Sequence, residues 1–250
     1  MKYLQFFSSV LTIAQTEELH ALRANDALTH FKVQPIAPCK YTFPVQTYGS
    51  AIMLASTFTD VVLGTLQDAV ERFAMGSDFA LAREIASVIG NEGEQQGWFR
   101  SVQDRIPNEL PFVTTSDLNF AFTAIQSFTV PGSCPNISAI PLTTFEPLNI
   151  PTTPGAKTQN ITIEFEDPNG EATDSLSLTY INQLNLPIVE SLQVISQDGN
   201  KITAMALFPY KENEMNGLTI AAVTKSHGPF ADANSVAKET LAGPGLIIIN

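Results

Sequence analysis

The sequence predicts an α+β protein of two domains, a helical bundle followed by an antiparallel β-sandwich. Apolar residues recur at helical spacing in the first half of the chain, and they alternate with polar residues after Gly155. The stretch between these parts is rich in Pro, Thr and Ser and has no periodicity, as in an extended linker. We therefore expect a bundle over residues 1–129, a linker over 130–155 and a sandwich over 156–250.

Four segments have the pattern of helices. Residues 10–29 are rich in Ala and Leu, with a stripe formed by Leu11, Ala14, Glu18, Ala21, Leu22 and Leu28. Residues 48–74 give the most regular pattern, and Gly76-Ser77-Asp78 ends that helix and caps the next one, over 79–105. A shorter apolar segment over 116–128 is expected to pack across the bundle.

After Gly155 the apolar residues fall into short runs with period two, as in half-buried strands. Turn sequences separate the runs, among them Asp167-Pro168-Asn169-Gly170 and Gln197-Asp198-Gly199-Asn200. Strands at this spacing predict a small β-sandwich.

The N-terminus allows two interpretations. Lys2 and the apolar run from Tyr3 to Ala14 have the charge, the apolar stretch and the small residue of a secretory signal peptide. The same residues also continue the first helix, in which case the chain begins partway into a bundle. No other apolar run approaches the roughly 20 residues of a membrane span, so we expect none in the mature protein.

Charge and cysteine content restrict the partners and the compartment. A formal net charge of -12 argues against nucleic acid and against anionic membranes. Cys39 and Cys134 fit one disulfide, but composition does not distinguish a disulfide from two free thiols. Two N-x-S/T sequons begin at Asn136 and Asn160. Together these features favour a secreted protein, in the cell wall or in a secretory or vacuolar compartment.

Polar residues interrupt the apolar face of the helix over 79–105. Leu81, Ile85, Val88 and Ile89 form an apolar stripe on this helix. If the stripe continues along the same face, Glu92 and either Gln95 or Gln96 lie in the core. A buried carboxylate needs a partner, either a second carboxylate through a metal or a hydrogen-bond network. Glu17 and His20 form an E-x-x-H pair on one face of the first helix, and we expect them to be the counterpart.

Four stretches of the sequence, in their order along the chain, resemble those of a known family. These are Glu17-Glu18-Leu19-His20, Cys39 to Val45, Leu54 to Gly64, and Glu92 to Arg100 followed by Ser133-Cys134-Pro135. The helical part resembles the ferritin-like domain of secreted fungal proteins described as stress-response or late-sexual-development proteins. The β-rich tail is similar to the C-terminal part of the same family.

The resemblance implies a four-helix bundle that can hold a di-iron or di-manganese pair. Glu17 and His20 match the first E-x-x-H of that family, and Glu92 matches the carboxylate of the second, whose histidine position is Gln95 here. The carboxylate of the middle helix falls at Thr59, with Asp60 one position away. The first helix of the family's bundle has no counterpart in these 250 residues.

About half of a two-metal ligand set is therefore present, and we weigh two outcomes. In one, Glu17, His20 and Glu92, with Asp60, keep a single iron or manganese ion. In the other, which we favour, the site is degenerate, no cofactor is bound, and Glu92, Gln95 and His20 form a polar network or face solvent.

The resemblance also marks Cys39 and Cys134 as cysteine positions. A bridge between them would fix the linker to the bundle, whereas pairing between chains would give a covalent assembly.

Three functions follow from these features. The first is a non-enzymatic structural protein, related to stress or development, that forms homo-oligomers or meets a partner chain at the groove left by the missing helix. The second is an iron or manganese oxidase or catalase-like enzyme at Glu17, His20 and Glu92. The third, carbohydrate or cell-wall binding by the sandwich, is based on architecture alone.

Overall fold

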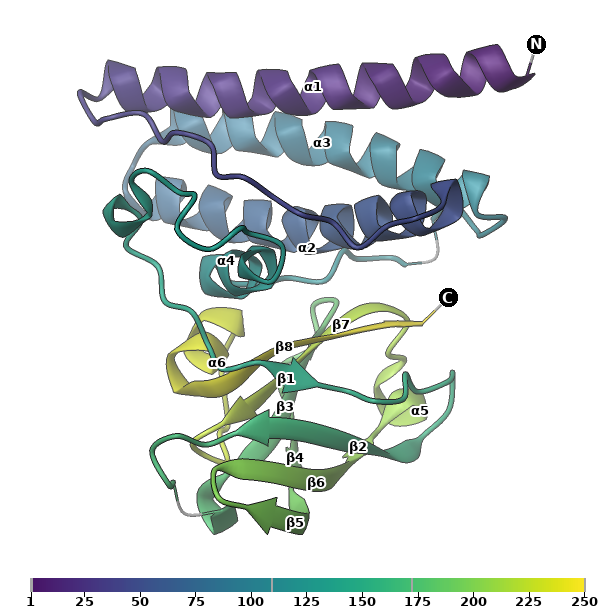
Figure 1. The fold of residues 1–250 in the computed structure, drawn as a ribbon, viewed down its shortest axis with the longest axis vertical. Helices are drawn as coiled ribbons and strands as arrows, with labels where there is room; N and C mark the ends of the chain where they lie inside the picture. The colour runs from purple at the N-terminus through teal and green to yellow at the C-terminus, as the bar shows by residue number, and fades with distance from the viewer. Residues whose placement is uncertain (1, 109, 172, 250) are drawn as a thin grey trace. The chain divides into compact units, whose positions relative to one another are not determined.

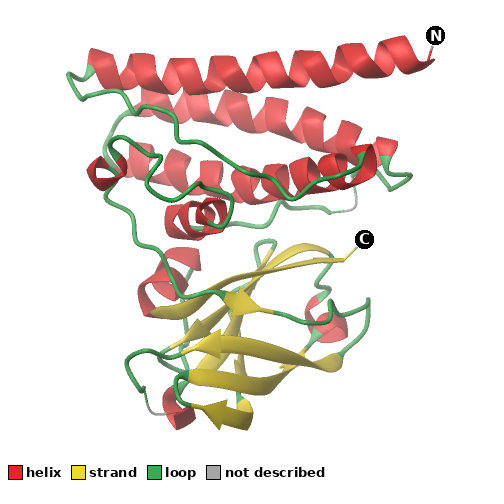
Figure 2. Ribbon diagram, viewed as in Figure 1, coloured by secondary structure: helices red, strands yellow, loops and turns green. Residues whose placement is uncertain are grey.

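The computed structural model of the chain describes residues 2–108, 110–171 and 173–249, with side chains from residue 8 onward. Helices α1 to α4 come first in the chain, and two antiparallel sheets with two short helices follow (Figures 1 and 2). The α+β fold class predicted from the sequence is confirmed.

The described chain divides into two compact units, each made of segments distant in sequence. The first unit contains Met1–Phe43 and Phe128–Pro141, and the second contains Pro44–Ser127 and Leu142–Asn250. This division differs from the three predicted ranges, whose boundaries stay predictions.

The first unit consists of α1 (Lys2–His30), the segment 31–43 that follows it, and the segment Phe128–Pro141. The side chain of Asn25 fixes the chain after α1, because its amide binds both the carbonyl and the N–H of Ile36 at 3.2 and 3.0 Å. Further along, Cys39 and Cys134 form an intrachain disulfide with a Cα–Cα distance of 4.3 Å. Backbone pairing of Tyr41 with Thr129 continues the junction. Of the two pairings that the sequence allowed, the structure has the one within the chain.

The stripe predicted on α1 is exposed except at Leu28, which is half-buried. Leu11 and Leu22 are 51% and 54% exposed, and Leu19 beside them is 64% exposed. Ile13 and His20, on roughly the opposite side of the helix, are half-buried. Periodicity identifies a stripe on a helix but does not decide which side meets a neighbour.

The helices of the second unit begin with side-chain caps. Thr47 caps α2 (Tyr48–Met75) in a capping box with Ser50, and Asp78 caps α3 (Phe79–Val102) by accepting from Leu81 N. The predicted helix over 79–105 ends three residues early, because Asp104 adopts a left-handed conformation with φ 57°. The side chain of Asp117 caps α4 (Leu118–Gln126).

Helix α2 is long and apolar enough to cross a membrane, with a mean hydropathy of 1.4 over its most apolar window, so the prediction that no other apolar run approaches the length of a span is wrong. Core helices pass the same test of length and composition. In this fold α2 buries Val61 in an apolar cluster with Phe120 of α4 and Ile220.

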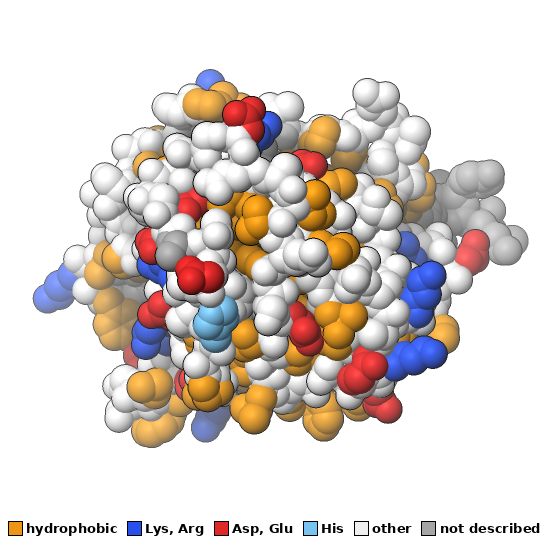
Figure 3. Space-filling model, turned by 90° about the horizontal axis from the view of Figure 1, so that it is seen from below, with side chains coloured by type: hydrophobic (Ala, Val, Ile, Leu, Met, Phe, Trp, Pro, Cys, Tyr) orange, Lys and Arg blue, Asp and Glu red, His pale blue; other side chains and the backbone are white. Residues whose placement is uncertain are grey.

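The sandwich consists of two four-stranded antiparallel sheets with strand orders β1-β2-β6-β5 and β4-β3-β7-β8. Its elements are β1 (Leu148–Asn149), β2 (Gln159–Glu166), β3 (Ser177–Asn182), β4 (Ile188–Ser191), β5 (Gln193–Asp198), β6 (Lys201–Phe208), α5 (Tyr210–Asn213), β7 (Gly217–Thr224), α6 (Ala233–Glu239) and β8 (Thr240–Ile249). Between the sheets lies a core that includes Ile163, Leu178, Tyr180 and Phe208. On the face drawn in Figure 3, acidic and basic side chains are interspersed among hydrophobic ones.

Strands β3 and β7 are buried on both faces, which their period-two pattern did not predict. One face lines the sandwich core. The other carries Ile181, Leu218 and Ile220, which pack with Val61 of α2, Phe120 of α4 and Val236 of α6. The hairpin of α2 and α3 and the sandwich therefore belong to one compact unit (Figure 1).

Candidate metal centre

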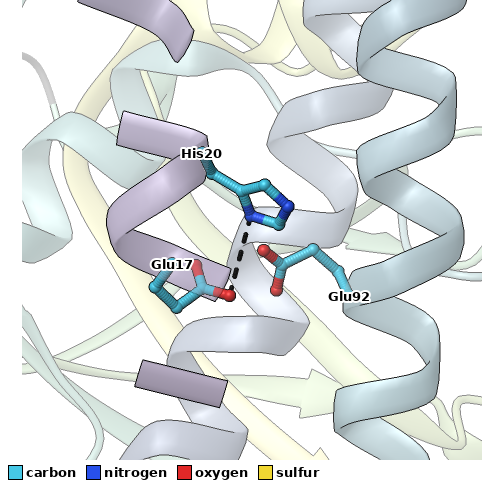
Figure 4. A group of neighbouring side chains, drawn as sticks. All are labelled: Glu17, His20 and Glu92. Atoms are coloured by element: carbon cyan, nitrogen blue, oxygen red, sulfur yellow. Dashed lines mark ion pairs between the residues drawn. The ribbon is translucent and has the colours of Figure 1, made fainter. Parts of the chain in front are cut away.

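The first part of the predicted ligand set lies on α1. Glu17 and His20 are three residues apart and so share a helix face. His20 Nδ1 lies 3.7 Å from Glu17 Oε1, and the two side chains are 25% and 46% exposed (Figure 4). The pair presents one imidazole nitrogen and one carboxylate oxygen, which are both ligands of divalent transition metals.

The second part lies on α3, where the predicted burial of polar side chains is confirmed. Glu92 is 3% exposed, and Gln95 and Gln96 are each 6% exposed. Gln95 Nε2 donates to Asn91 Oδ1 at 3.1 Å, one turn earlier on the same helix. Glu92, labelled in Figure 4, is the carboxylate that α3 can offer to a metal.

Glu17 and His20 belong to the first compact unit and Glu92 to the second. The grouping of these three residues in one site therefore stays a prediction.

On α2, the position expected to carry a carboxylate is Thr59, which is buried. The neighbouring Asp60 is half-buried. Burial raises the pKa of Asp60 from 3.8 to about 6, and the positive charge of Arg100 is the main opposing influence. Arg100 itself is 3% exposed, and its Nε donates to the carbonyl of Ile106 at 2.6 Å.

Gln96 links these groups into a polar core within the helical hairpin. Its Oε1 accepts from Ser56 Oγ of α2 at 3.0 Å. The amide of Gln96 also acts on Asp60 and lowers its pKa, although Nε2 makes no hydrogen bond of ordinary geometry. Asp60 thus has a guanidinium and an amide as neighbours.

These residues do not fit a two-metal centre. Two divalent cations need several carboxylates for charge balance and an imidazole from each E-x-x-H. The second E-x-x-H has Gln95 in place of histidine, and that amide is bound to Asn91. Asp60 is next to the fixed positive charge of Arg100, which opposes a cation at the same carboxylate.

Residues 5–105 match the family model of the ferritin-like domain. The ferritin-like part of the sequence-based prediction is therefore shown, and the matched range contains Glu17, His20, Asp60, Glu92 and Gln95. It ends before the sandwich.

Two further comparisons add little. No curated protein matches the chain. Among solved structures, the crystal structure of the Lin-41 filamin domain aligns with 41% of this chain and 91% of its own, at 13% identity and a TM-score of 0.23. A likeness at that score carries no structural argument.

Sequence reasoning missed an ion-pair network near the end of α2, in which the exposed Arg72 pairs with two buried carboxylates. Arg72 Nε lies 3.0 Å from both carboxylate oxygens of Asp68, and Nη2 lies 2.9 Å from Asp117 Oδ2. Asp68 also accepts from the N–H of Leu118 at 2.9 Å. The i, i+4 spacing of Asp68 and Arg72 was a visible signal, but the third partner is 45 residues further along the chain.

His227 forms a contact that resembles part of a catalytic triad. Its Nδ1 lies 2.5 Å from Ser177 Oγ, and its Nε2 lies 2.9 Å from the carbonyl of Asp174. Ser177 is fully buried, so its hydroxyl is not placed to attack a substrate. The contact fixes the loop after β7 to β3.

The two sequons differ in their surroundings. Asn160 lies on the exposed side of β2. The half-buried amide of Asn136 accepts from Ala37 N at 3.2 Å and donates to the carbonyl of Pro35 at 3.3 Å. A glycan at Asn160 would meet solvent, whereas one at Asn136 would disturb these two hydrogen bonds.

Proposed function

We propose that this chain is a non-enzymatic structural protein, built on a ferritin-like domain that has lost two-metal chemistry and acting in stress response or development. The observation that carries the proposal is the polar core of the α2–α3 hairpin. There the carboxylate of Asp60 is next to Arg100, and an amide, Gln95, stands at the second histidine position.

The physical reason is charge and coordination. Arg100 supplies near Asp60 the positive charge that a metal would otherwise supply, and it is held by the Ile106 carbonyl. An amide is a weaker ligand than imidazole for iron or manganese. A bundle with this interior keeps its shape without a cofactor.

The test is the metal content of the full chain, purified without chelators and measured by plasma mass spectrometry. We expect iron and manganese well below one ion per chain. Stoichiometric iron or manganese that disappears in His20→Ala, but remains in the control His30→Ala on the same helix, would overturn the proposal.

One arrangement favours a second candidate function. Glu17 and His20 are paired on α1, and Glu92 is a buried carboxylate on α3. Were these three to form one site, they would hold a single iron or manganese ion suited to oxidase or catalase-like chemistry. If this second function is correct, the purified protein should contain one iron or manganese ion per chain, and both His20→Ala and Glu92→Gln should lose it.

Self-association is part of the first proposal. The exposed leucines of α1, Leu11, Leu19 and Leu22, lie within one sector of the helix and form an apolar strip. Sedimentation equilibrium should show a homo-oligomer that dissociates in Leu19→Lys but not in the control Ala24→Lys, which is exposed on the other side of the same helix. A monodisperse monomeric wild type would contradict this.

Secretion is the proposed localisation. An intrachain disulfide and a sequon with an exposed asparagine are typical of proteins made in an oxidising compartment. Expression through a eukaryotic secretory pathway should give a glycan that Asn160→Gln removes. A secreted product of unmodified mass at Asn160 would contradict the glycan.

A further inference from the structure

A cavity of about 740 Å³ lies wholly within the second compact unit. It is bordered by the end of α2, the segment 143–146, the turn at Pro168 and Asn169, and α6 with the start of β8. Its size falls in the range of about 300–1,000 Å³ that is usual for small-molecule sites. None of the predicted metal ligands borders it.

Three of the chain's 13 basic residues border this cavity, although the net charge is -12. They are Arg72, Lys225 and Lys238. Arg72 is held in place by Asp68 and Asp117, and among the described residues its Nη1 forms no hydrogen bond. The cavity therefore has a preorganised guanidinium in its wall.

The two lysines are brought together by strand pairing. Thr224 of β7 pairs with Thr240 of β8, and Lys225 N donates to the carbonyl of Glu239 at 2.9 Å. Lys225 therefore follows β7 beside the end of α6, where Lys238 lies. In the part of the chain that the structure describes, neither ammonium has a carboxylate within 4.0 Å. An anion bound here would relieve the repulsion between them.

The acidic residues at the cavity neutralise Arg72, which pairs with both Asp68 and Asp117, but they do not cancel the charge of the two lysines. Asp117 is 2% exposed, and its carboxylate is paired with Arg72. Glu146 is half-buried, and it is the remaining carboxylate among the described lining residues. Lys225 and Lys238 are both exposed, so the groups presented to a ligand are net positive.

Hydrogen-bonding groups surround these charges. The side-chain amides of Asn169 and Asn234 and the hydroxyl of Thr144 have no hydrogen bond among the described residues. They can donate to and accept from hydroxyl groups, and Glu146 can accept from one. Phe145 and Leu241 add apolar surface.

We propose that this cavity binds a small molecule that bears both a carboxylate and several hydroxyls, such as a hexuronate. Lys225 and Lys238, with Arg72, bind the carboxylate, while the amides, Thr144 and Glu146 bind the hydroxyls. The site stands apart from the ferritin-like proposal, since it shares no residue with the predicted metal ligands.

The test uses D-glucuronate as the probe and D-glucose as its neutral match, titrated by calorimetry and by amide chemical shifts into the full chain. Glucuronate should bind saturably and glucose about tenfold more weakly or not at all. The double variant Lys225→Gln/Lys238→Gln should weaken glucuronate binding about tenfold. The control Lys157→Gln/Lys211→Gln removes the same charge from exposed positions elsewhere in the second unit and should leave binding unchanged.

Each alternative outcome overturns the proposal. Absence of saturable glucuronate binding would mean that the cavity holds only solvent. Equal affinity for glucose would remove the role of the lysines, as would equal weakening in the two double variants. Matching melting temperatures of wild type and both variants establish that folding is not the cause of any loss, because all four lysines are exposed.

Discussion

Removal of the Cys39–Cys134 disulfide is the most direct perturbation of the first compact unit. The bridge joins the segment after α1 to the segment before β1, where backbone hydrogen bonds also run between the two. The double substitution Cys39→Ala/Cys134→Ala removes the covalent link and leaves those hydrogen bonds in place.

The expected loss is set by the entropy of the unfolded chain. The two cysteines are 95 positions apart. Closing a loop of that length in the unfolded ensemble corresponds to about 4.7 kcal/mol at room temperature in the chain-entropy model. Both cysteines are half-buried, so little packing is lost with the sulfurs. We expect the free energy of unfolding to fall by about 3–5 kcal/mol.

Equilibrium unfolding in urea, followed by circular dichroism and by the fluorescence of Trp98, measures this loss. Reduced wild type should unfold like the double alanine variant, since both lack the covalent link. Ser133→Ala is the control, because it removes the two exposed hydrogen bonds of the Ser133 hydroxyl, one from Lys40 N and one to the Lys40 carbonyl, beside the bridge and should cost about 1 kcal/mol.

A loss below about 1 kcal/mol in the double variant would refute the loop-entropy reasoning. It would mean that residual structure already brings the two segments together in the unfolded chain.

Three more predictions concern the second unit. Gly64→Ala places a Cβ 2.4 Å from the carbonyl oxygen of Thr114 and should destabilise the protein by about 1–3 kcal/mol. Gly90→Ala, whose Cβ would have nothing within 4 Å, should stabilise the protein by up to about 1 kcal/mol. Thermal melts that rank the two variants the other way would refute the packing argument. Asp68→Ala should cost about 1–3 kcal/mol in urea, because Leu118 N loses its partner while the exposed Arg72 keeps Asp117. The exposed neighbour Glu71→Ala should cost at most about 0.5 kcal/mol. Burial raises the pKa of folded Asp60 from 3.8 to about 6, so its contribution to stability is full below about pH 4 and is lost as the pH rises through about 6. Asp60→Asn should flatten that part of the profile of stability against pH. Parallel profiles for wild type and variant would contradict the raised pKa.

The helical hairpin was predictable because its signals are local. Apolar periodicity and the Gly-Ser-Asp sequence placed α2 and α3 within three residues of their observed ends. The same periodicity carried Glu92, Gln95 and Gln96 into the core, where they are buried. Strand positions followed from period-two runs and from turn sequences in the same way.

Other features depended on partners that the local pattern does not specify. The half-buried side of α1 lies opposite the exposed Leu11, Leu19 and Leu22. Arg72 of α2 pairs with Asp117, which lies 45 residues further along the chain. Asp60 of α2 has as its counter-charge Arg100 of α3. Strand β7 is apolar on both faces because helices cover its outer face.

The sequence alone therefore determined the fold class, most of the elements and the burial of Glu92, Gln95 and Gln96, since these follow from the periodicity of neighbouring residues. Tertiary structure decided the pairing of the cysteines, the exposure of the α1 stripe and the charge environment of Asp60. It also placed Lys225 beside the end of α6, where Lys238 lies, because strand register and helix packing join residues that no local pattern relates.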